Sequence, residues 1–282
     1  FAPDPAWGDK SVLGGAIGNN STGAHSLQYG KTDAYVEACE VVLADGTVTT
    51  FEPVAIDELD ELADSDGNLE GRIYAAVRDV LNDEAIADAY PDLERNVSGY
   101  NLDYVIERAR EDGVVDMPGL LAGSEGTLAV VTEAEISLES VPETKALALL
   151  RYDDLLEAME DVEPILDHDP AAVEVLDDVL LDLARDTSEF GDLVAEMVPA
   201  GTGAVLLVEF YAESDEAGRE KVADLLADRS PGTESLADPT DGRIETDAQV
   251  RAASADEAHD EAERDQFWKL RKSGLPILLG RT

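Results

Sequence analysis

Glycine and small polar residues crowd one short segment of this 282-residue chain, and they restrict what that segment can become. Residues 11–23 include four glycines together with serine, threonine and asparagine. Such a segment lacks the large side chains of a core, but its backbone N–H groups can converge on an anion, and a phosphate or a flat ring can approach the bare backbone closely. The spacing alone leaves two interpretations open, an anion-binding loop and an ordinary glycine turn.

The same glycines exclude the dinucleotide fingerprint of doubly wound folds. That fingerprint needs G-x-G-x-x-G between a strand and a helix, whereas Gly15 and Gly18 supply only G-x-x-G. A second glycine loop, Gly-Ser-Glu-Gly-Thr-Leu at residues 123–128, precedes the apolar run 129–131. One such loop is common in proteins, but two in one chain favour a nucleotide-like ligand.

The charge of the chain restricts its partners. It has 64 acidic and 20 basic residues, which gives a net charge of −44. Nucleic acids and anionic lipids need a basic surface, so neither is expected as a partner. Hydrophobic residues still make up 44% of the chain, enough for a sizeable core. Because salt screens self-repulsion of this size, we predict a protein adapted to molar salt, as in halophilic microbes. An ordinary acidic protein is the alternative, and the glycine loops contain almost none of the charge.

The remaining composition predicts a protein without disulfides, metal site or membrane span. Cys39 is the only cysteine, so we expect a reducing, cytoplasmic location, with peripheral membrane association as the alternative. The three histidines are scattered, and no apolar run reaches the length of a transmembrane helix. The start at Phe1 and the end at Thr282 suggest a piece of a longer protein.

Hydrophobic periodicity predicts two α+β domains that meet at Pro142, residues 1–142 and 143–282. In the first we expect a hairpin of strands 36–42 and 48–51, a helical acidic region 53–113, and a loop that feeds a strand within 120–138. In the second we expect alternating strands and helices followed by an acidic loop and a helix, which suggests a ferredoxin-like layer. Its expected elements are a strand at 146–152, a helix at 155–166, a helical stretch at 175–185, a strand at 204–211, a helix at 216–226 and the loop and helix at 227–262.

An ordered series of motifs resembles the FAD-linked oxidases of the vanillyl-alcohol-oxidase type. The motifs are residues 1–5, the glycine segment, 26–32 and 39–46, and residues 123–132 are similar to the second flavin motif of that family. Residues 95–103 and 267–275 resemble a narrower branch, the long D-2-hydroxyacid dehydrogenases with a flavin half and an iron–sulfur half.

The resemblance implies that residues 1–142 are the second part of a PCMH-type FAD-binding domain, and residues 143–282 an incomplete substrate domain. Arg271 would bind the substrate carboxylate, because a guanidinium can pair both of its oxygens. A solvated helix charge beside Lys269 and Lys272 is the alternative for Arg271. The residues implied to line FAD are Gly14, Gly15, Asn19, Asn20, Ser21, Gly23, Tyr29, Gly30, Glu125, Gly126 and Val130.

The implied activity is the oxidation of a D-2-hydroxy acid (D-lactate, glycolate or D-2-hydroxyglutarate) to the 2-oxo acid, by hydride transfer to flavin. The electrons would pass to an iron–sulfur cluster or a quinone-type acceptor. The first flavin loop, the general base, the metal ligands and the cysteine-rich iron–sulfur region are expected outside this chain. Two alternatives stay open: a related flavin protein of different chemistry, of the reductase or ether-lipid synthase type, and a scaffold subunit without cofactor.

Overall fold

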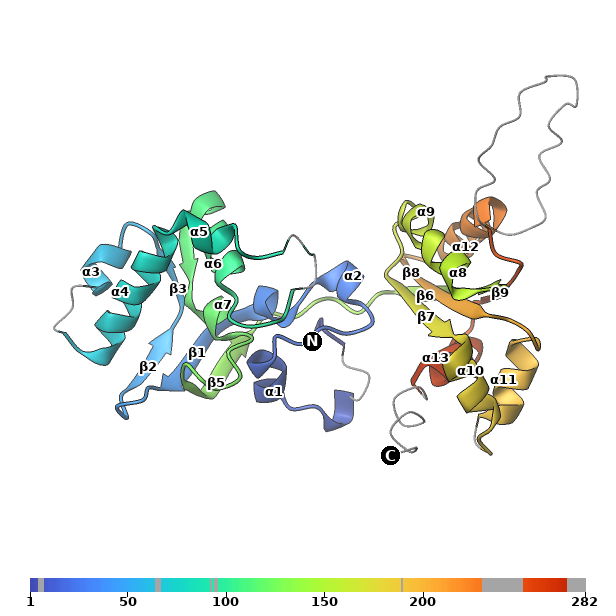
Figure 1. Ribbon diagram of the computed structural model, residues 1–282, viewed down its shortest axis with the longest axis horizontal. Coiled ribbons are helices and arrows are strands. Elements are labelled where there is room, and N and C mark those ends of the chain that lie inside the picture. The colour runs from blue at the N-terminus through green and yellow to red at the C-terminus, as the bar shows by residue number, and fades with distance from the viewer. Residues whose placement is uncertain are drawn as a thin grey trace, which may run out of the picture. The chain divides into compact units, whose positions relative to one another are not determined.

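The computed structural model describes residues 1–4, 8–63, 67–91, 93, 96–188, 190–229 and 251–272. The chain divides into two compact units, Phe1–Glu139 and Ser140–Thr282 (Figure 1). Each unit combines helices with an antiparallel sheet, which confirms the α+β class predicted from the sequence.

The first unit contains a three-stranded sheet with the order β2-β1-β5. Its strands are β1 (Val36–Val42), β2 (Val48–Phe51) and β5 (Val130–Ile136). The predicted hairpin is confirmed, because β1 and β2 pair antiparallel and Val42 lies opposite Val48. Gly46 takes a left-handed φ of +87° in the connecting turn, a conformation that glycine adopts without strain. Cys39 and Val41 of β1 are fully buried and belong to the core of this unit.

Helices pack around this sheet and complete the core. The amphipathic helix α4 starts after Asn68, whose side chain caps the helix by accepting a bond from Gly71 N at 2.8 Å. The region predicted as helical, 53–113, begins instead with a short strand, β3 (Pro53–Ala55), which pairs with β4 (Val114–Asp116) just after the region. This strand was missed because three residues carry no periodic signal. The helices are α3 (Leu59–Ala63), α4 (Leu69–Leu81), α5 (Glu84–Ala87), α6 (Leu102–Glu111) and α7 (Met117–Leu121).

The glycine segment lies at the edge of the first unit. It forms the short helix α1 (Leu13–Gly18), and the chain continues through α2 (Ser26–Tyr29) and a 3₁₀ turn, η2 (Thr32–Tyr35), into β1. Another 3₁₀ turn, η1 (Gly8–Lys10), precedes α1. Ile17 is the only residue of α1 that is fully buried, so one side chain anchors this helix to the core.

The second unit is built on a four-stranded antiparallel sheet with the order β7-β8-β6-β9. Its strands are β6 (Thr144–Tyr152), β7 (Ala172–Asp177), β8 (Ala204–Ala212) and β9 (Ser254–Ala258). β6 and β7 are consecutive in the chain, but β8 lies between them in the sheet. β8 and β9 are likewise consecutive, and β6 lies between them. Two interleaved split β-α-β units of this kind make a ferredoxin-like layer, as predicted.

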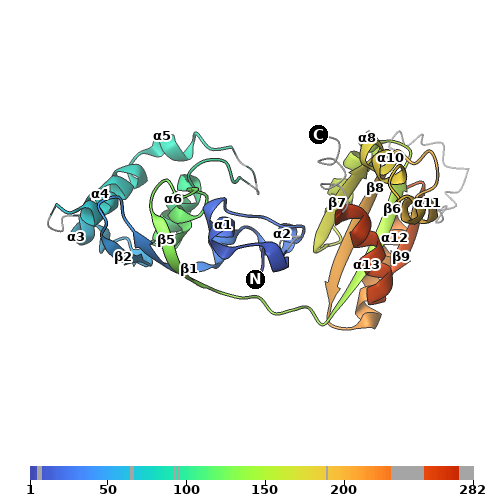
Figure 2. The same cartoon turned by 90° about the horizontal axis from the view of Figure 1, so that it is seen from below.

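Helices cover both faces of this sheet, which explains why its central strands are largely apolar. On one face Ala148 and Leu150 pack beneath α8 (Leu155–Glu160), α9 (Val162–Leu166) and α12 (Asp215–Arg229) (Figure 1). On the other face Leu147 and Leu149 pack against α10 (Asp178–Arg185), α11 (Gly191–Met197) and α13 (Glu261–Lys272). Figure 2 shows α13 crossing in front of the sheet.

A buried ion pair joins α12 to the turn between α8 and α9 on one face of the sheet. Arg229, at the end of α12, pairs with Asp161 between α8 and α9, and the Tyr152 hydroxyl donates to the same carboxylate at 2.6 Å. Both charged side chains are almost completely buried, so removing either one would leave an unpaired buried charge and strongly destabilise the fold. The Arg229 carbonyl also accepts a hydrogen bond from Ala252 N at 3.0 Å, just before β9.

Three sequence predictions for this unit were wrong in detail. The helix expected at 155–166 is two helices that meet at Asp161, because Pro164 has no N–H to continue the helical bonds. Residues 175–177 form the end of β7 rather than a helix. β9 lies in the region expected to be loop and helix, of which residues 230–250 are outside the described part of the chain.

Candidate functional site

The two glycine loops of the sequence lie against each other in the first unit. Gly123 N donates to Ile17 O at 2.9 Å, and Glu125 N donates to Gly18 O at 2.8 Å. Gly123 has a φ of +86°, and a Cβ there would lie 3.3 Å from Gly99 O, so glycine suits this contact. Segments more than a hundred residues apart therefore form one continuous backbone surface.

The outer face of α1 combines bare backbone with exposed apolar side chains. Gly14 and Gly15 are exposed, and a Cβ on Gly14 would meet no atom within 4 Å. Val12 is 71% exposed and Leu13 is 37% exposed beside them. Gly15 N and Ala16 N both donate to Val12 O at 3.1 Å, so the donors that the first turn offers beside the apolar surface are the N–H groups of Leu13 and Gly14. Such a surface suits a flat ring joined to an anionic group.

Acidic residues are absent from the segment that contains α1 and α2. No aspartate or glutamate occurs from residue 10 to residue 32, although the chain has 64 of them in 282 residues. The segment instead contains Lys10, His25 and Lys31. A carboxylate close to a bound phosphate would repel it, so this gap in the charge pattern is what an anion site needs.

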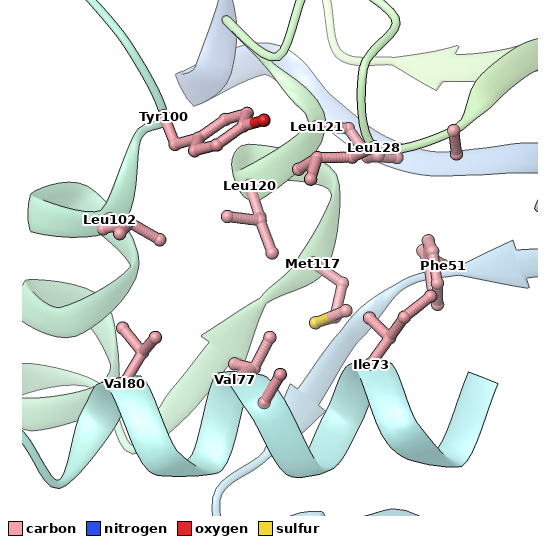
Figure 3. Close-up of a pocket in the computed structure, with 12 residues that line it drawn as sticks. Phe51, Ile73, Val77, Val80, Tyr100, Leu102, Met117, Leu120, Leu121 and Leu128 are labelled. Carbon is pink, nitrogen blue, oxygen red and sulfur yellow. The ribbon is translucent and has the colours of Figure 1, made fainter. Parts of the chain in front are cut away.

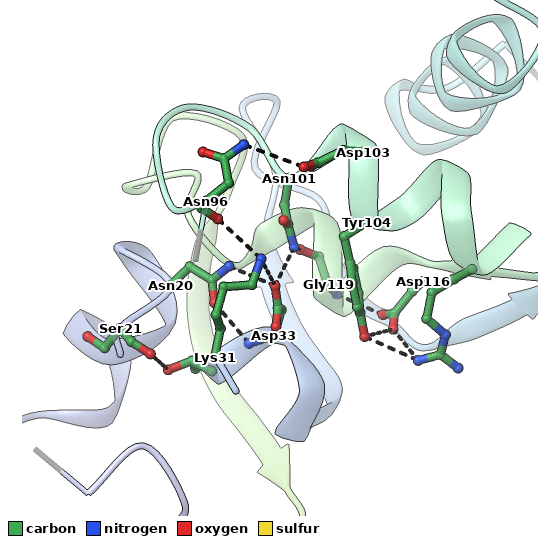
Figure 4. Close-up of polar contacts among 12 residues, drawn as sticks. Asn20, Ser21, Lys31, Asp33, Asn96, Asn101, Asp103, Tyr104, Asp116 and Gly119 are labelled. Atoms are coloured by element: carbon green, nitrogen blue, oxygen red, sulfur yellow. Dashed lines mark hydrogen bonds and ion pairs between the residues drawn. The ribbon is translucent and has the colours of Figure 1, made fainter. Parts of the chain in front are cut away.

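Asn20 holds the glycine loop in place through its buried side chain. Its Nδ2 donates to Asp33 Oδ2 at 2.8 Å, and its Oδ1 accepts from Asp33 N at 2.9 Å (Figure 4). Asn20 is 1% exposed and has a left-handed φ of +48°, a conformation that asparagine tolerates better than most residues. Asn20 was predicted to line the cofactor; in the structure its side chain points inward, its N–H donates to Ile17 O at 3.1 Å, and the residue supports the loop from within.

Asp33 is the centre of a larger network that brings a third motif to the site. Asn101 Nδ2 donates to Asp33 Oδ2 at 2.9 Å, and Lys31 Nζ lies 3.0 Å from the same oxygen. Lys31 also donates to Asn96 O at 3.1 Å (Figure 4). Residues from the motif at 95–103 are thus tied to the loop that follows the glycine segment.

A second carboxylate extends this network. Asp116 accepts from Gly119 N at 2.7 Å and pairs with Arg108 Nη1 at 3.0 Å, while Asn101 Nδ2 donates to Gly119 O at 3.1 Å. Burial is the main cause that raises the pKa of Asp116, against the opposing effects of the Gly119 N–H and Arg108. The two networks fix α7, which leads directly into the second glycine loop.

The other predicted flavin residues lie around the two loops. Asn19 is exposed, and its side chain accepts a bond from Ser21 Oγ at 2.5 Å. Gly23 has a packing role, because a Cβ there would lie 1.8 Å from Pro3 O. Tyr29 O accepts from the Tyr35 hydroxyl at 2.9 Å. Exposed positions with a left-handed backbone or an uncovered apolar side chain complete the set: Gly30, Glu125, Gly126 and Val130.

An apolar cavity of about 290 Å³ lies next to the second loop (Figure 3). Leu128 of that loop and the following Ala129 line it together with residues of α4 and α7. The Tyr100 hydroxyl, from another lining residue, is 3.0 Å from Thr127 Oγ1. The cavity lining contains no charged residue, so the anionic part of a ligand belongs to the loop surface and not to this cavity.

Arg271 lies in the second unit, on α13. Its Nε donates to Glu174 Oε2 of β7 at 3.0 Å, and its side chain is 37% exposed. None of the described residues bonds its two terminal amino groups. Among all residues that the structure describes, there is no group of three or more His, Cys, Asp or Glu side chains that could hold a metal ion. None of the helices described is long and apolar enough to cross a bilayer.

Comparison with known families decides what these units are. The sequence profile of the FAD linked oxidases, C-terminal domain, matches residues 141–282, and that of an FAD binding domain matches residues 1–52. The chain belongs to the FAD-linked oxidases. The resemblance seen in its motifs is therefore confirmed, and FAD is the cofactor of the domains that match.

Two curated relatives of this FAD-linked oxidase are much longer proteins. It is 29% identical over 232 residues to D-2-hydroxyglutarate dehydrogenase of Escherichia coli K12, covering 80% of this chain and 22% of that protein. It is 30% identical over 211 residues to glycolate oxidase subunit GlcD of Bacillus subtilis 168, covering 74% of this chain and 32% of that protein. The chain thus spans between about a fifth and a third of these relatives.

A solved structure of alkyldihydroxyacetonephosphate synthase covers 95% of this FAD-linked oxidase and 36% of its own chain. The identity is 15% and the TM-score 0.49, too weak a likeness to indicate an activity.

Sequence reasoning missed two residues of the network that ties the glycine segment to α7, Asp33 and Asn101. Asp33 is one of 64 acids, so its identity carried no signal. Its position did carry one, since it is the first acid after the acid-free segment and lies three residues before β1.

Proposed function

We propose that this chain is the part of an FAD-dependent dehydrogenase that holds one side of the flavin and contributes to binding a D-2-hydroxy acid. The observation that carries the proposal is the joining of the two glycine loops by the backbone bonds from Gly123 and Glu125. These bonds place the acid-free segment 10–32 beside the second loop, in which Glu125 is the one acid.

The residues of the first unit would bind the cofactor in distinct ways. Gly14 and Gly15 allow the diphosphate to approach the start of α1, and exposed Val12 and Leu13 offer an apolar contact to a ring. Asn19, Ser21 and Gly23 continue the wall toward Tyr29 and Gly30. Glu125, Gly126 and Val130 lie on the other loop and on β5, where they would contact the adenosine side.

In the second unit Arg271 would bind the carboxylate of the substrate. A guanidinium presents paired N–H groups in a plane, which matches the two oxygens of a carboxylate and fixes the direction of the Cα–H bond. Bound FAD supplies the chemistry, since it accepts a hydride from that carbon. D-2-Hydroxyglutarate and glycolate are substrates to test because of the names of the two relatives, and D-lactate because the motif resemblance implies it. An iron–sulfur or quinone-type group would accept the electrons.

The test uses the intact enzyme that contains this chain, purified with its flavin and kept free of oxygen. Each of the three 2-hydroxy acids is added separately, and the flavin absorbance is followed. Bleaching by at least one of them, with formation of the matching 2-oxo acid, is the expected result. An enzyme that bleaches with NADPH instead would be a reductase, and one that carries no flavin would be a scaffold. Either outcome would refute the proposal.

A further inference from the structure

Two carboxylates of the second unit hold α13 against the sheet. Ala172 of β7 lies opposite Glu209 of β8, and Glu174 is two residues further along β7, so Glu174 and Glu209 project from the same face of the sheet. Glu209 accepts from Trp268 Nε1 at 2.7 Å, and Glu174 accepts from Arg271 Nε at 3.0 Å. Because Trp268 and Arg271 are three residues apart, both acids act on one side of α13.

The contact between Glu174 and Arg271 uses only one edge of the guanidinium. Glu174 occupies Nε, while the edge formed by the two terminal amino groups has no partner among the described residues. The Glu174 side chain is 17% exposed, whereas that of Arg271 is 37% exposed. An exposed surface pair would leave both side chains free to move. Here the acid is largely covered, so the arginine is held at its inner edge and open at its outer edge.

We propose that Glu174 is a positioning residue for the substrate: it holds Arg271 through Nε and so presents the terminal edge of the guanidinium to the carboxylate of the 2-hydroxy acid. The proposal rests on the function proposed above. It adds a residue that touches neither substrate nor flavin. An arginine has many rotamers, and one that is already anchored loses less freedom when the ligand binds. Glu174 should therefore affect substrate affinity more than the rate of hydride transfer.

The experiment compares four variants of the intact, flavin-loaded enzyme with the parent. Glu174→Ala removes the anchor, and Glu174→Gln keeps an oxygen that can accept from Nε. Arg271→Lys removes the planar fork. Glu160→Gln removes one acidic charge from the same unit at an exposed position of α8, and it serves as the matched control. For each variant, kcat, KM and the melting temperature are measured. The dissociation constant of the 2-oxo acid product is obtained from the change in flavin absorbance without turnover.

We expect Glu174→Ala to raise KM and the product dissociation constant about tenfold, which corresponds to about 1.4 kcal/mol, with kcat within about twofold of the parent. Glu174→Gln should restore most of the affinity, and Glu160→Gln should change nothing. Arg271→Lys should raise KM further, about a hundredfold, because the bidentate contact is lost. A role confined to folding would lower the melting temperature and leave KM unchanged.

The possible failures can be told apart. If none of the three 2-hydroxy acids bleaches the flavin, the proposed function fails. If Arg271→Lys leaves KM unchanged, Arg271 does not bind the carboxylate and Glu174 has nothing to position. If Arg271→Lys raises KM but Glu174→Ala leaves it within twofold or lowers it, only the role of Glu174 is refuted. If Glu174→Ala does not fold, Glu174→Gln provides the test. This variant keeps an oxygen that can accept from Arg271 Nε, so it should retain most of the substrate affinity. A loss of affinity as large as that of Arg271→Lys would refute the role of Glu174.

Discussion

Asn20 and Asp33 bond each other twice: the Asn20 side chain donates to the Asp33 carboxylate at 2.8 Å, and Asp33 N donates back to the Asn20 side-chain oxygen at 2.9 Å. Both residues are almost completely buried, at 1% and 2% exposure. The pair joins the glycine segment to the turn before β1. It fixes a left-handed residue in the middle of a loop that has few side chains of its own to hold it.

Replacing Asp33 by alanine should strongly destabilise the first unit. The change leaves the side chains of Asn20, Asn101 and Lys31 without their shared acceptor. Breaking a buried charged contact of this kind typically costs about 3–5 kcal/mol. Urea unfolding of the purified chain measures the loss. Asp57→Ala, at an exposed position, is the control and should stay within about 0.5 kcal/mol of the parent. Equal stability of the two variants would show that the network contributes little.

Two glycine substitutions should separate cofactor binding from folding. A Cβ on Gly15 would meet only the Val12 side chain, at 3.3 Å, so Gly15→Asp should fold with nearly unchanged stability. Its carboxylate would face the diphosphate, so the intact enzyme should lose FAD, with affinity reduced about a hundredfold or more. Gly23→Ala should do the opposite, because its Cβ would clash with Pro3 O, and stability should fall first. Flavin content and the melting temperature of both variants test this pair, and full flavin retention by Gly15→Asp would contradict the loop assignment.

Cys39 should be inert in the folded protein and should make stability fall at high pH. Burial raises the pKa of its thiol from 9.0 to about 11. The folded state therefore disfavours the thiolate, so this contribution to stability is present below pH 9 and is lost as pH rises toward 11. At pH 8 a thiol reagent should react only after unfolding.

The difference in unfolding free energy between the parent and Cys39→Ala should shrink by about 2 kcal/mol from pH 9 to pH 11, at about 1.4 kcal/mol per unit of pKa. A difference that stays constant over this range, or rapid labelling of the native thiol, would count against the burial of Cys39.

Salt should stabilise this chain. The net charge of −44 is carried largely by helices and exposed loops, and its self-repulsion opposes a compact state. We expect the melting temperature to rise from dilute buffer to molar KCl as the charges are screened over about 10 Å or less. An uncharged solute at equal osmolality is the control and should have a smaller effect. A melting temperature that does not respond to KCl would remove the case for adaptation to high salt.

Local sequence patterns predicted the elements whose own residues favour them. The repeat of Leu69, Ile73 and Val77 lies in the region predicted as helical and forms α4, and the apolar run at 204–211 was predicted as the strand that is β8. β9 was missed because Ser-Ala-Asp-Glu-Ala contains no β-branched or aromatic residue. It becomes a strand at the edge of the sheet through its pairing with β6, a tertiary effect that no local pattern carries.

The same distinction applies to the candidate site. The glycine content of both loops was visible in the sequence, and so was their suitability for an anion. Their contact through Ile17 and Gly123 was not, because it depends on how α1 and α7 pack. The inward orientation of Asn20 also had no local signal, since an asparagine in a glycine loop serves equally well as a ligand or as a support for the turn.

The hydrogen bonds made by Ala252 and Ala253 hold the chain just before β9. Ala252 N donates to Arg229 O at the end of α12 at 3.0 Å, and Ala253 N donates to Arg151 O of β6 at 2.7 Å. Both bonds form outside the strand itself, so the register of β9 against β6 is set at its entry as well as along its length. A five-residue edge strand with little strand propensity of its own is thereby kept in one alignment, which protects the sheet from a slip that would turn each side chain of β9 to the opposite face.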